Sequence, residues 1–157
     1  MPGHAVRPVI AEALDAADAH GLHHHVERHF GHADVLINNA GLFSPSGNIS
    51  TVSPTNWWAD FEINVKGTFL VTQGFLKLLG TERQGTIITM STAIAYMAPP
   101  GLSAYSISKM ASVRLSEYVS TEYKNVNAVS LQPGVVKTDM VTGMCQLFEL
   151  VGYQLML

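Results

Sequence analysis

The sequence predicts an α/β fold in which a parallel sheet is flanked by helices. Three short apolar runs, at 34–38, 85–90 and 125–131, are rich in residues that favour strands. Longer segments with apolar residues at helical spacing lie between these runs, at 53–79 and 103–123. Strands that alternate with helices usually form a parallel sheet, so we expect about three strands of this kind.

The composition bounds the classes of protein to consider. The 157 residues suit one domain, and 47% hydrophobic with 13% charged residues is typical of a globular, core-rich chain. A net charge of −3 gives no basic surface for nucleic acid or for an anionic membrane. Cys145 has no second cysteine to pair with, which agrees with a reducing compartment. No apolar run approaches the roughly 18 residues of a membrane-spanning helix. We therefore expect no nucleic-acid partner, no membrane partner and a cytoplasmic location.

Residues 1–32 are expected to be a helical lead-in. The alanine-rich pattern from Pro8 to His20 predicts a helix that ends at Gly21. A second helix is predicted over 22–30, closed by Gly31.

A histidine cluster falls in this lead-in. His25 and His29 are one helical turn apart, a spacing that two ligands of one metal ion can use. The simpler interpretation is a solvated helix face that is rich in histidine, because no nearby cysteine completes a tetrahedral set. We expect no metal site.

The segment 53–79 has the strongest helix signals. Ser53 can cap the helix, Pro54 suits its first position, and Gly80 ends it. The apolar positions that predict its buried stripe are Trp57, Phe61, Val65, Phe69, Leu76 and Leu79. Asn64 is set into that stripe, where an amide competes with backbone hydrogen bonds.

Residues with reactive side chains follow the strand at 85–90. Ser91 and Thr92 place hydroxyl groups where this strand should end, and Ser103 is the predicted N-cap of the next helix. Tyr105 and Lys109 are four residues apart on that helix and therefore share a face. A lysine ammonium near a phenol favours the phenolate, so we expect Lys109 to lower the pKa of Tyr105.

Three features together resemble the short-chain dehydrogenase/reductase family. They are Tyr105-x-x-x-Lys109, a hydroxyl 13 residues before the tyrosine, and the segment from Asn38 to Gly41 (NNAG) after an apolar strand. The resemblance implies one incomplete, Rossmann-like, doubly wound domain over residues 1–157. Its core is expected over 33–140, with a shortened substrate-loop tail over 141–157.

The resemblance also implies a reaction, a reversible hydride transfer between a nicotinamide and a small-molecule carbonyl or secondary alcohol. In the family's scheme Tyr105 exchanges the proton, Lys109 tunes it and holds the nicotinamide ribose, and Asn64 anchors a relay water. A hydroxyl steadies the substrate oxygen. Counting back 13 residues gives Thr92 for this role, with Ser91 as the alternative.

The coenzyme implied by the resemblance is NAD or NADP. Besides Tyr105 and Lys109, its contacts are expected from Asn39, Ala40 and Gly41 after the first strand, and from Pro133, Gly134, Val136 and Thr138 after the third. The sequence has no TGxxxGxG segment, which in the family seats the pyrophosphate, and it offers no choice between NAD and NADP.

Two functional hypotheses follow. The first is an NAD(P)-dependent oxidoreductase, with a homo-oligomer formed through the helices at 53–79 and 103–123, which the family uses for its interface. The second is a catalytically silent fragment or splice form that acts by pairing with a full-length relative, because the retained strands correspond to the fourth, fifth and sixth of the family's sheet.

Overall fold

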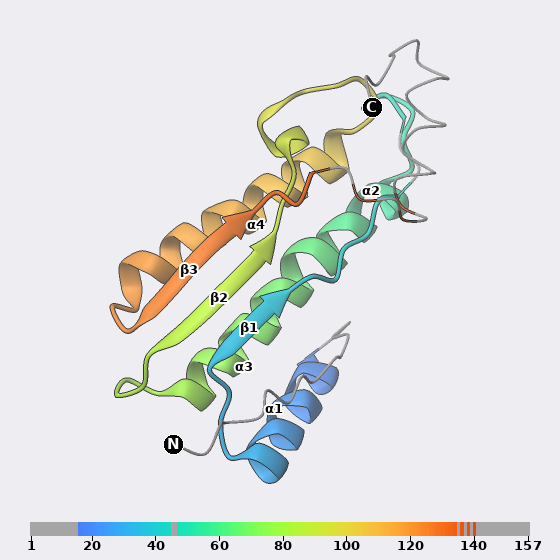
Figure 1. The fold of residues 1–157 in the computed structure, drawn as a ribbon. Helices are drawn as coiled ribbons and strands as arrows, with labels where there is room; N and C mark the ends of the chain where they lie inside the picture. The colour runs from blue at the N-terminus through green and yellow to red at the C-terminus, as the bar shows by residue number, and fades with distance from the viewer. Residues whose placement is uncertain (1–15, 45–46, 135, 137, 139, 141–157) are drawn as a thin grey trace.

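The computed structural model describes residues 16–44, 47–134, 136, 138 and 140 (Figure 1). The sheet consists of β1 (Val35–Asn38), β2 (Gly85–Met90) and β3 (Val126–Leu131), all parallel and in the order β1-β2-β3. The strands lie within a residue of the predicted apolar runs. The predicted α/β fold with a partial, Rossmann-like parallel sheet is confirmed.

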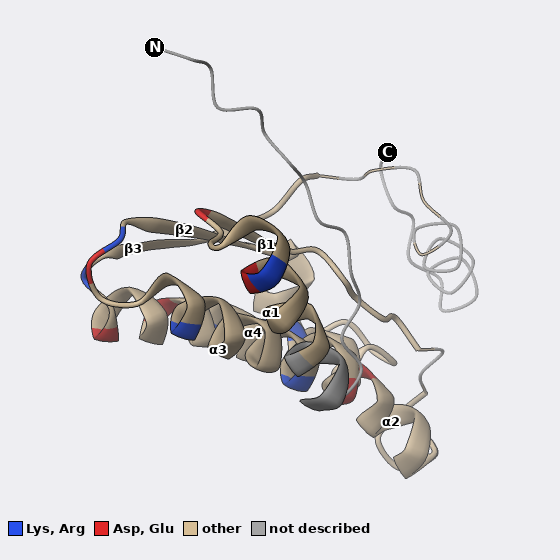
Figure 2. Cartoon of the chain, turned by 90° about the horizontal axis from the view of Figure 1, so that it is seen from below, with Lys and Arg blue, Asp and Glu red and all other residues tan. Residues whose placement is uncertain are grey.

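The four α-helices of the described part of the chain lie to one side of this sheet (Figure 2). They are α1 (Ala16–Phe30), α2 (Pro54–Phe61), α3 (Thr68–Leu79) and α4 (Ser103–Glu122). Figure 2 shows α1, α3 and α4 on the same side of the three strands. A π-helical turn, Glu62–Gly67, joins α2 to α3, and a short 3-10 helix, Ala93–Tyr96, follows β2.

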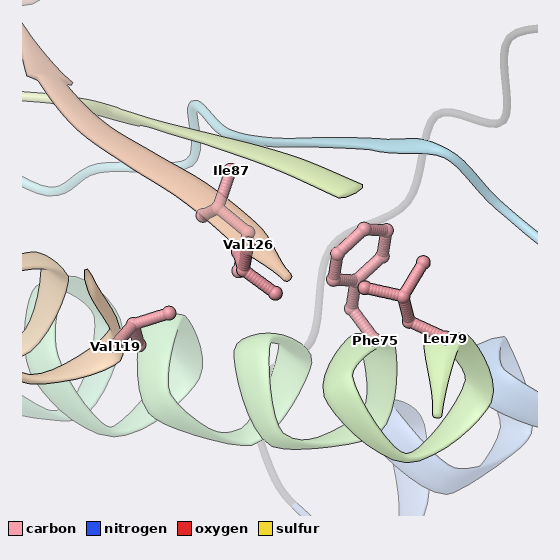
Figure 3. Close-up of a cluster of buried hydrophobic side chains, with 5 residues drawn as sticks. All are labelled: Phe75, Leu79, Ile87, Val119 and Val126. Carbon is pink, nitrogen blue, oxygen red and sulfur yellow. The ribbon is translucent and has the colours of Figure 1, made fainter. Parts of the chain in front are cut away.

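The apolar core lies between α3, α4 and the sheet. Its buried side chains are Phe75, Leu79, Ile87, Val119 and Val126 (Figure 3). Helix α3 approaches β2 closely, because a Cβ atom at Gly85 would lie only 2.6 Å from Leu79 Cδ2. A glycine at the start of β2 is therefore part of the helix–sheet packing.

The opposite face of the sheet is apolar and is not covered by any described residue. Ile37 of β1 is 57% exposed and Val129 of β3 is 42% exposed, and Ile88 of β2 lies in register between them. Because side chains alternate between the two faces of a strand, this row lies on the face opposite to the buried core. Within the described residues β1 pairs only with β2, so its outer edge is open.

One helix boundary in the lead-in was predicted wrongly. Helix α1 runs without a break through Gly21 and ends at Gly31, whose φ of +75° suits the glycine that follows a helix. An internal glycine costs only about 1 kcal/mol relative to alanine, and α1 offsets this by packing against α3. Residues 8–15 of the predicted first helix and the tail over 141–157 lie outside the described residues.

The helical segment 53–79 forms as predicted, but its buried stripe changes course at Asn64. Phe69, expected to be buried, is 45% exposed. The π-helical turn around Asn64 contains an extra residue, which rotates all later positions about the axis. The buried residues of α3 are consequently Thr68, Thr72, Phe75 and Leu79.

The predicted caps are also corrected. Ser103 is the first residue of α4, Leu102 is the N-cap, and the Ser103 hydroxyl accepts a hydrogen bond from Trp57 Nε1 at 3.0 Å. Ser53 occupies the N-cap position of α2 but makes no capping hydrogen bond. None of the described helices is both long enough and apolar enough to cross a membrane.

Candidate active site

The candidate site lies at the carboxyl end of the sheet. The segments that follow β1, β2 and β3 begin side by side there, since the strands are parallel (Figure 1). The backbone N–H of Ser91, just after β2, donates to the carbonyl of Leu131, the last residue of β3, at 2.8 Å, which keeps the start of the segment after β2 beside β3. Ligands of open α/β sheets bind at this end.

Lys109 extends from α4 to the carboxyl end of the sheet. Its buried ammonium donates to the carbonyl oxygen of Met90 at 3.0 Å. A Cβ atom at Gly41 would lie 3.2 Å from Lys109 Nζ and 3.5 Å from Asn64 Oδ1, so the NNAG segment passes close to both groups. Burial lowers the pKa of Lys109, and the charge of Asp60 opposes this shift.

Asn64 holds the segment that follows β1. Its Oδ1 accepts from the backbone N–H of Leu42 at 2.8 Å, and its Nδ2 donates to the carbonyl of Leu42 and to Ser108 Oγ, both at 2.9 Å. The Ser112 hydroxyl in turn donates to the carbonyl of Asn64 at 2.7 Å, a carbonyl within the π-helical turn. The asparagine is thus fully engaged and joins three segments of the chain.

Tyr105 lies on the same face of α4 as Lys109, one turn earlier, and is buried. Its ring meets the ring of Phe43 edge-on, with centroids 5.2 Å apart, and its hydroxyl donates to Met140 Sδ at 3.9 Å. Burial raises the pKa of Tyr105, and the charge of Asp60 raises it further. The expected lowering by Lys109 is not seen, because the ammonium is directed to the Met90 carbonyl.

The two candidate hydroxyls differ in their partners. Thr92 is extended, and its Oγ1 accepts from the backbone N–H of Ile94 at 3.3 Å, which caps the 3-10 helix. Ser91 Oγ is buried and has no hydrogen-bond partner among the described residues. Ser91 therefore keeps an uncommitted donor next to the Lys109 site, whereas the Thr92 hydroxyl acts as an acceptor.

The residues expected to contact a coenzyme lie in the segments at the carboxyl end of the sheet. Asn39 and Ala40 are exposed after β1. Pro133, Gly134, Val136 and Thr138 are exposed in the segment after β3, which reaches Tyr105 through Met140. These residues and the close approach at Gly41 lie at the carboxyl end of the sheet, and their contact with a coenzyme stays a prediction.

The two histidines of α1 with the spacing of metal ligands pack on each other. The rings of His25 and His29 stack with centroids 4.2 Å apart, and His29 Nδ1 lies 2.9 Å from the carbonyl of His25. Within the described ranges, no group of three or more histidine, cysteine, aspartate or glutamate residues could hold a metal ion.

Sequence reasoning missed Asp60 and Phe43. Asp60 is completely buried on α2, one turn before Asn64, and accepts from the backbone N–H of Ser44. An aspartate at i−4 from the asparagine, inside an apolar stripe, was the available signal. Phe43 carried no comparable signal, because its role depends on a contact across the fold.

Comparisons with known proteins agree on one family. A family model described as short chain dehydrogenase matches residues 3–146. The short chain dehydrogenase mpl6 of Monascus purpureus is 36% identical over 147 residues, which cover 90% of this chain and 50% of that protein. Among solved structures, an NAD+-bound xylitol dehydrogenase matches with a TM-score of 0.84 and 25% identity, over 93% of this chain and 57% of that one. A gluconate 5-dehydrogenase from Burkholderia cenocepacia, in complex with NADP and tartrate, shares the fold with a TM-score of 0.77 and 23% identity, over 83% and 51%. The chain spans about half the length of the curated relatives it matches.

Proposed function

The chain belongs to the short-chain dehydrogenase family, and from this membership we propose that its site transfers hydride between NAD or NADP and a small carbonyl or secondary alcohol. The observation that carries the proposal is the position of Lys109. Its ammonium donates to the Met90 carbonyl and lies close to Gly41, one helical turn from Tyr105. An ammonium carries three donors, so a buried amine that gives one of them to a carbonyl at the carboxyl end of the sheet is suited to a ligand there rather than to packing alone.

The protein's part in the reaction is to supply the proton and to orient the oxygen. The bound nicotinamide would supply or accept the hydride. In the reducing direction the Tyr105 hydroxyl donates its proton to the substrate oxygen. The carbonyl carbon takes the hydride and the oxygen takes this proton, which together give the alcohol. The hydroxyl of Thr92 or Ser91 donates a hydrogen bond to the same oxygen as negative charge develops there. For Lys109 to stabilise the phenolate that remains, its ammonium would have to turn from the Met90 carbonyl toward Tyr105.

Met140 occupies the position that a substrate oxygen would need. Its sulfur accepts from the Tyr105 hydroxyl at 3.9 Å. A thioether is a weak acceptor, so exchanging it for a carbonyl oxygen costs little and gains a stronger hydrogen bond. We infer that the Met140 sulfur leaves the Tyr105 hydroxyl when substrate binds.

The residues proposed to hold the coenzyme are Asn39, Ala40, Gly41, Pro133, Gly134, Val136 and Thr138, together with Tyr105 and Lys109. Both coenzymes stay in the proposal, because the solved structures that match contain NAD+ in one case and NADP in another.

A homo-oligomer through the long helices is part of this proposal. A groove of about 280 Å³ lies between α3 and α4. Phe69 and Tyr118 line it, and both are exposed. Aromatic side chains at the rim of an apolar groove are typical of an interface.

The second candidate function is a silent fragment that pairs with a full-length relative. The observation that favours it is the bare sheet face, on which Ile37, Ile88 and Val129 form an apolar row without cover from the described residues. Such a face can accept elements from another chain.

Titration of the purified chain with NADH and with NADPH, followed by coenzyme fluorescence, separates the two functions. The oxidoreductase predicts saturable binding that Lys109→Met weakens. Lys77→Met is the matched control, since Lys77 is exposed on α3 and bonds only to Gln73 among the interactions described. Failure to saturate with either coenzyme would favour the silent fragment.

A further inference from the structure

Asp60 is a buried carboxyl group that the proposed reaction does not use. Its exposed fraction is 0%, and it lies on α2 one helical turn before Asn64. Oδ1 accepts from the backbone N–H of Ser44 at 2.9 Å. Oδ2 has no hydrogen-bond partner among the described residues. A buried carboxyl group with an open oxygen is costly to keep, which calls for an explanation beyond packing.

Asp60 and Asn64 together hold the segment that follows β1. Asn64 bonds both the N–H and the carbonyl of Leu42, as a neighbouring strand would, and Asp60 takes the N–H of Ser44 two residues later. Phe43 lies between these two anchored residues. Its ring meets that of Tyr105 at 88° and 5.2 Å, so the two side chains of α2 and the π turn fix the wall against which the phenol rests.

The carboxyl group also acts on the proton-bearing residues through its charge. Burial raises the pKa of Asp60, while the hydrogen bonds from Ser44 and the charge of Lys109 oppose the rise. In return, the charge of Asp60 adds to the rise that burial causes in the pKa of Tyr105 and opposes the fall that burial causes in the pKa of Lys109. Among the described residues, Asp60 on α2 and Lys109 on α4 are the charged groups of the cluster formed by Asp60, Tyr105 and Lys109. The residues that contact them from the strand β2 and from the segment 41–44 are uncharged.

We propose that Asp60 is a positioning residue of the active site, which anchors Ser44 so that Phe43 lies against Tyr105 and which places a negative charge beside the Tyr105–Lys109 pair. The proposal rests on the function proposed above for Tyr105. Asp60 then has two tasks, the anchoring of the backbone and the placing of a charge, and different variants can remove them.

The test follows the Tyr105 phenol by NMR in the full chain, with a carbon-13 label on the tyrosine Cζ atoms and the signal assigned by its loss in Tyr105→Phe. Asp60→Asn keeps an oxygen for the Ser44 N–H but removes the charge. The Tyr105 titration midpoint should move to lower pH, while the ring contact with Phe43 is retained. Asp60→Leu removes both, so the midpoint should fall and the Phe43–Tyr105 nuclear Overhauser effect should be lost. Glu62→Gln is the matched control, because Glu62 is an exposed carboxylate two residues later, at the start of the π-helical turn, and pairs with Lys66.

An unchanged midpoint in Asp60→Asn, or a shift as large in Glu62→Gln, would overturn the proposal, and so would a retained Phe43–Tyr105 contact in folded Asp60→Leu. If Asp60→Leu does not fold, Asp60→Asn alone decides the charge effect. None of these readouts needs coenzyme or substrate. A chain that fails to bind NADH but shows the Tyr105 shift would refute the proposed function and leave the anchoring and charge roles of Asp60 in place.

Discussion

Replacing Asn64 by alanine tests how the site is tied to the fold. The side chain makes three buried or partly buried hydrogen bonds, to the N–H and carbonyl of Leu42 and to the Ser108 hydroxyl. At about 1 kcal/mol net for each bond, the loss is about 3 kcal/mol. Alanine returns about 0.5 kcal/mol through its better helix propensity. Ser108 keeps its own donor bond to the Tyr105 carbonyl, so it is not left unpaired.

We therefore expect Asn64→Ala to lower the free energy of unfolding by about 2–4 kcal/mol, measured by urea denaturation followed by circular dichroism. Asn64→Asp should cost at least as much, because its second oxygen would face the Leu42 carbonyl. The control is Asn56→Ala on the exposed side of α2, which should stay within about 0.5 kcal/mol of wild type. A loss below about 1 kcal/mol for Asn64→Ala would show that these bonds do not hold the segment after β1 in place.

Three further predictions follow from burial and charge. Gly85→Ala should destabilise the chain by about 1–3 kcal/mol in urea denaturation, since its Cβ would meet Leu79 Cδ2 at 2.6 Å; an unchanged midpoint would contradict the close helix–sheet packing. Burial raises the pKa of Asp60 above its ordinary 3.8, so the folded chain binds this proton more tightly than the unfolded chain, and the stability that the group contributes falls as pH rises from about 4. Asp60→Asn has no such proton, so its free energy of unfolding should rise relative to that of wild type between pH about 4 and pH about 7. A difference in unfolding free energy that stays constant with pH would refute the raised pKa of Asp60. The bare sheet face should bind the dye anilinonaphthalene sulfonate, and Ile37→Thr with Val129→Thr should reduce the fluorescence without lowering stability by more than about 1 kcal/mol; undiminished fluorescence would place the dye elsewhere.

Local patterns predicted the strands and the long helices well. Short apolar runs such as 85–90, rich in residues that favour strands, predict buried strands. Pro54 and Gly80 stand at the start and the end of the second helical segment, as their backbone preferences require. Gly21 misled the prediction of α1, because the packing of α1 on α3 outweighs a local helix-breaking tendency.

The geometry inside the site could not be derived from spacing alone. The i, i+4 rule places Tyr105 and Lys109 on one face of α4, and they lie there. It does not say where the ammonium points, and the Met90 carbonyl at the end of β2 takes it. The π-helical turn at Asn64 and the buried carboxyl group of Asp60 likewise depend on the segment 41–44, which is distant in sequence and adjacent only in the fold.

The most direct test of the central claim is the consumption of NADH and NADPH by the purified chain with a panel of small ketones, compared between wild type and Tyr105→Phe. Tyr105→Phe removes only the hydroxyl that donates to Met140 Sδ, so the fold should be retained, and the two proteins are compared at saturating coenzyme. If Tyr105 supplies the proton, wild type oxidises the coenzyme and the variant loses about 100-fold or more of that rate. Equal rates in the two proteins, or no ketone-dependent oxidation by wild type, would contradict the assignment of this site as a hydride-transfer centre.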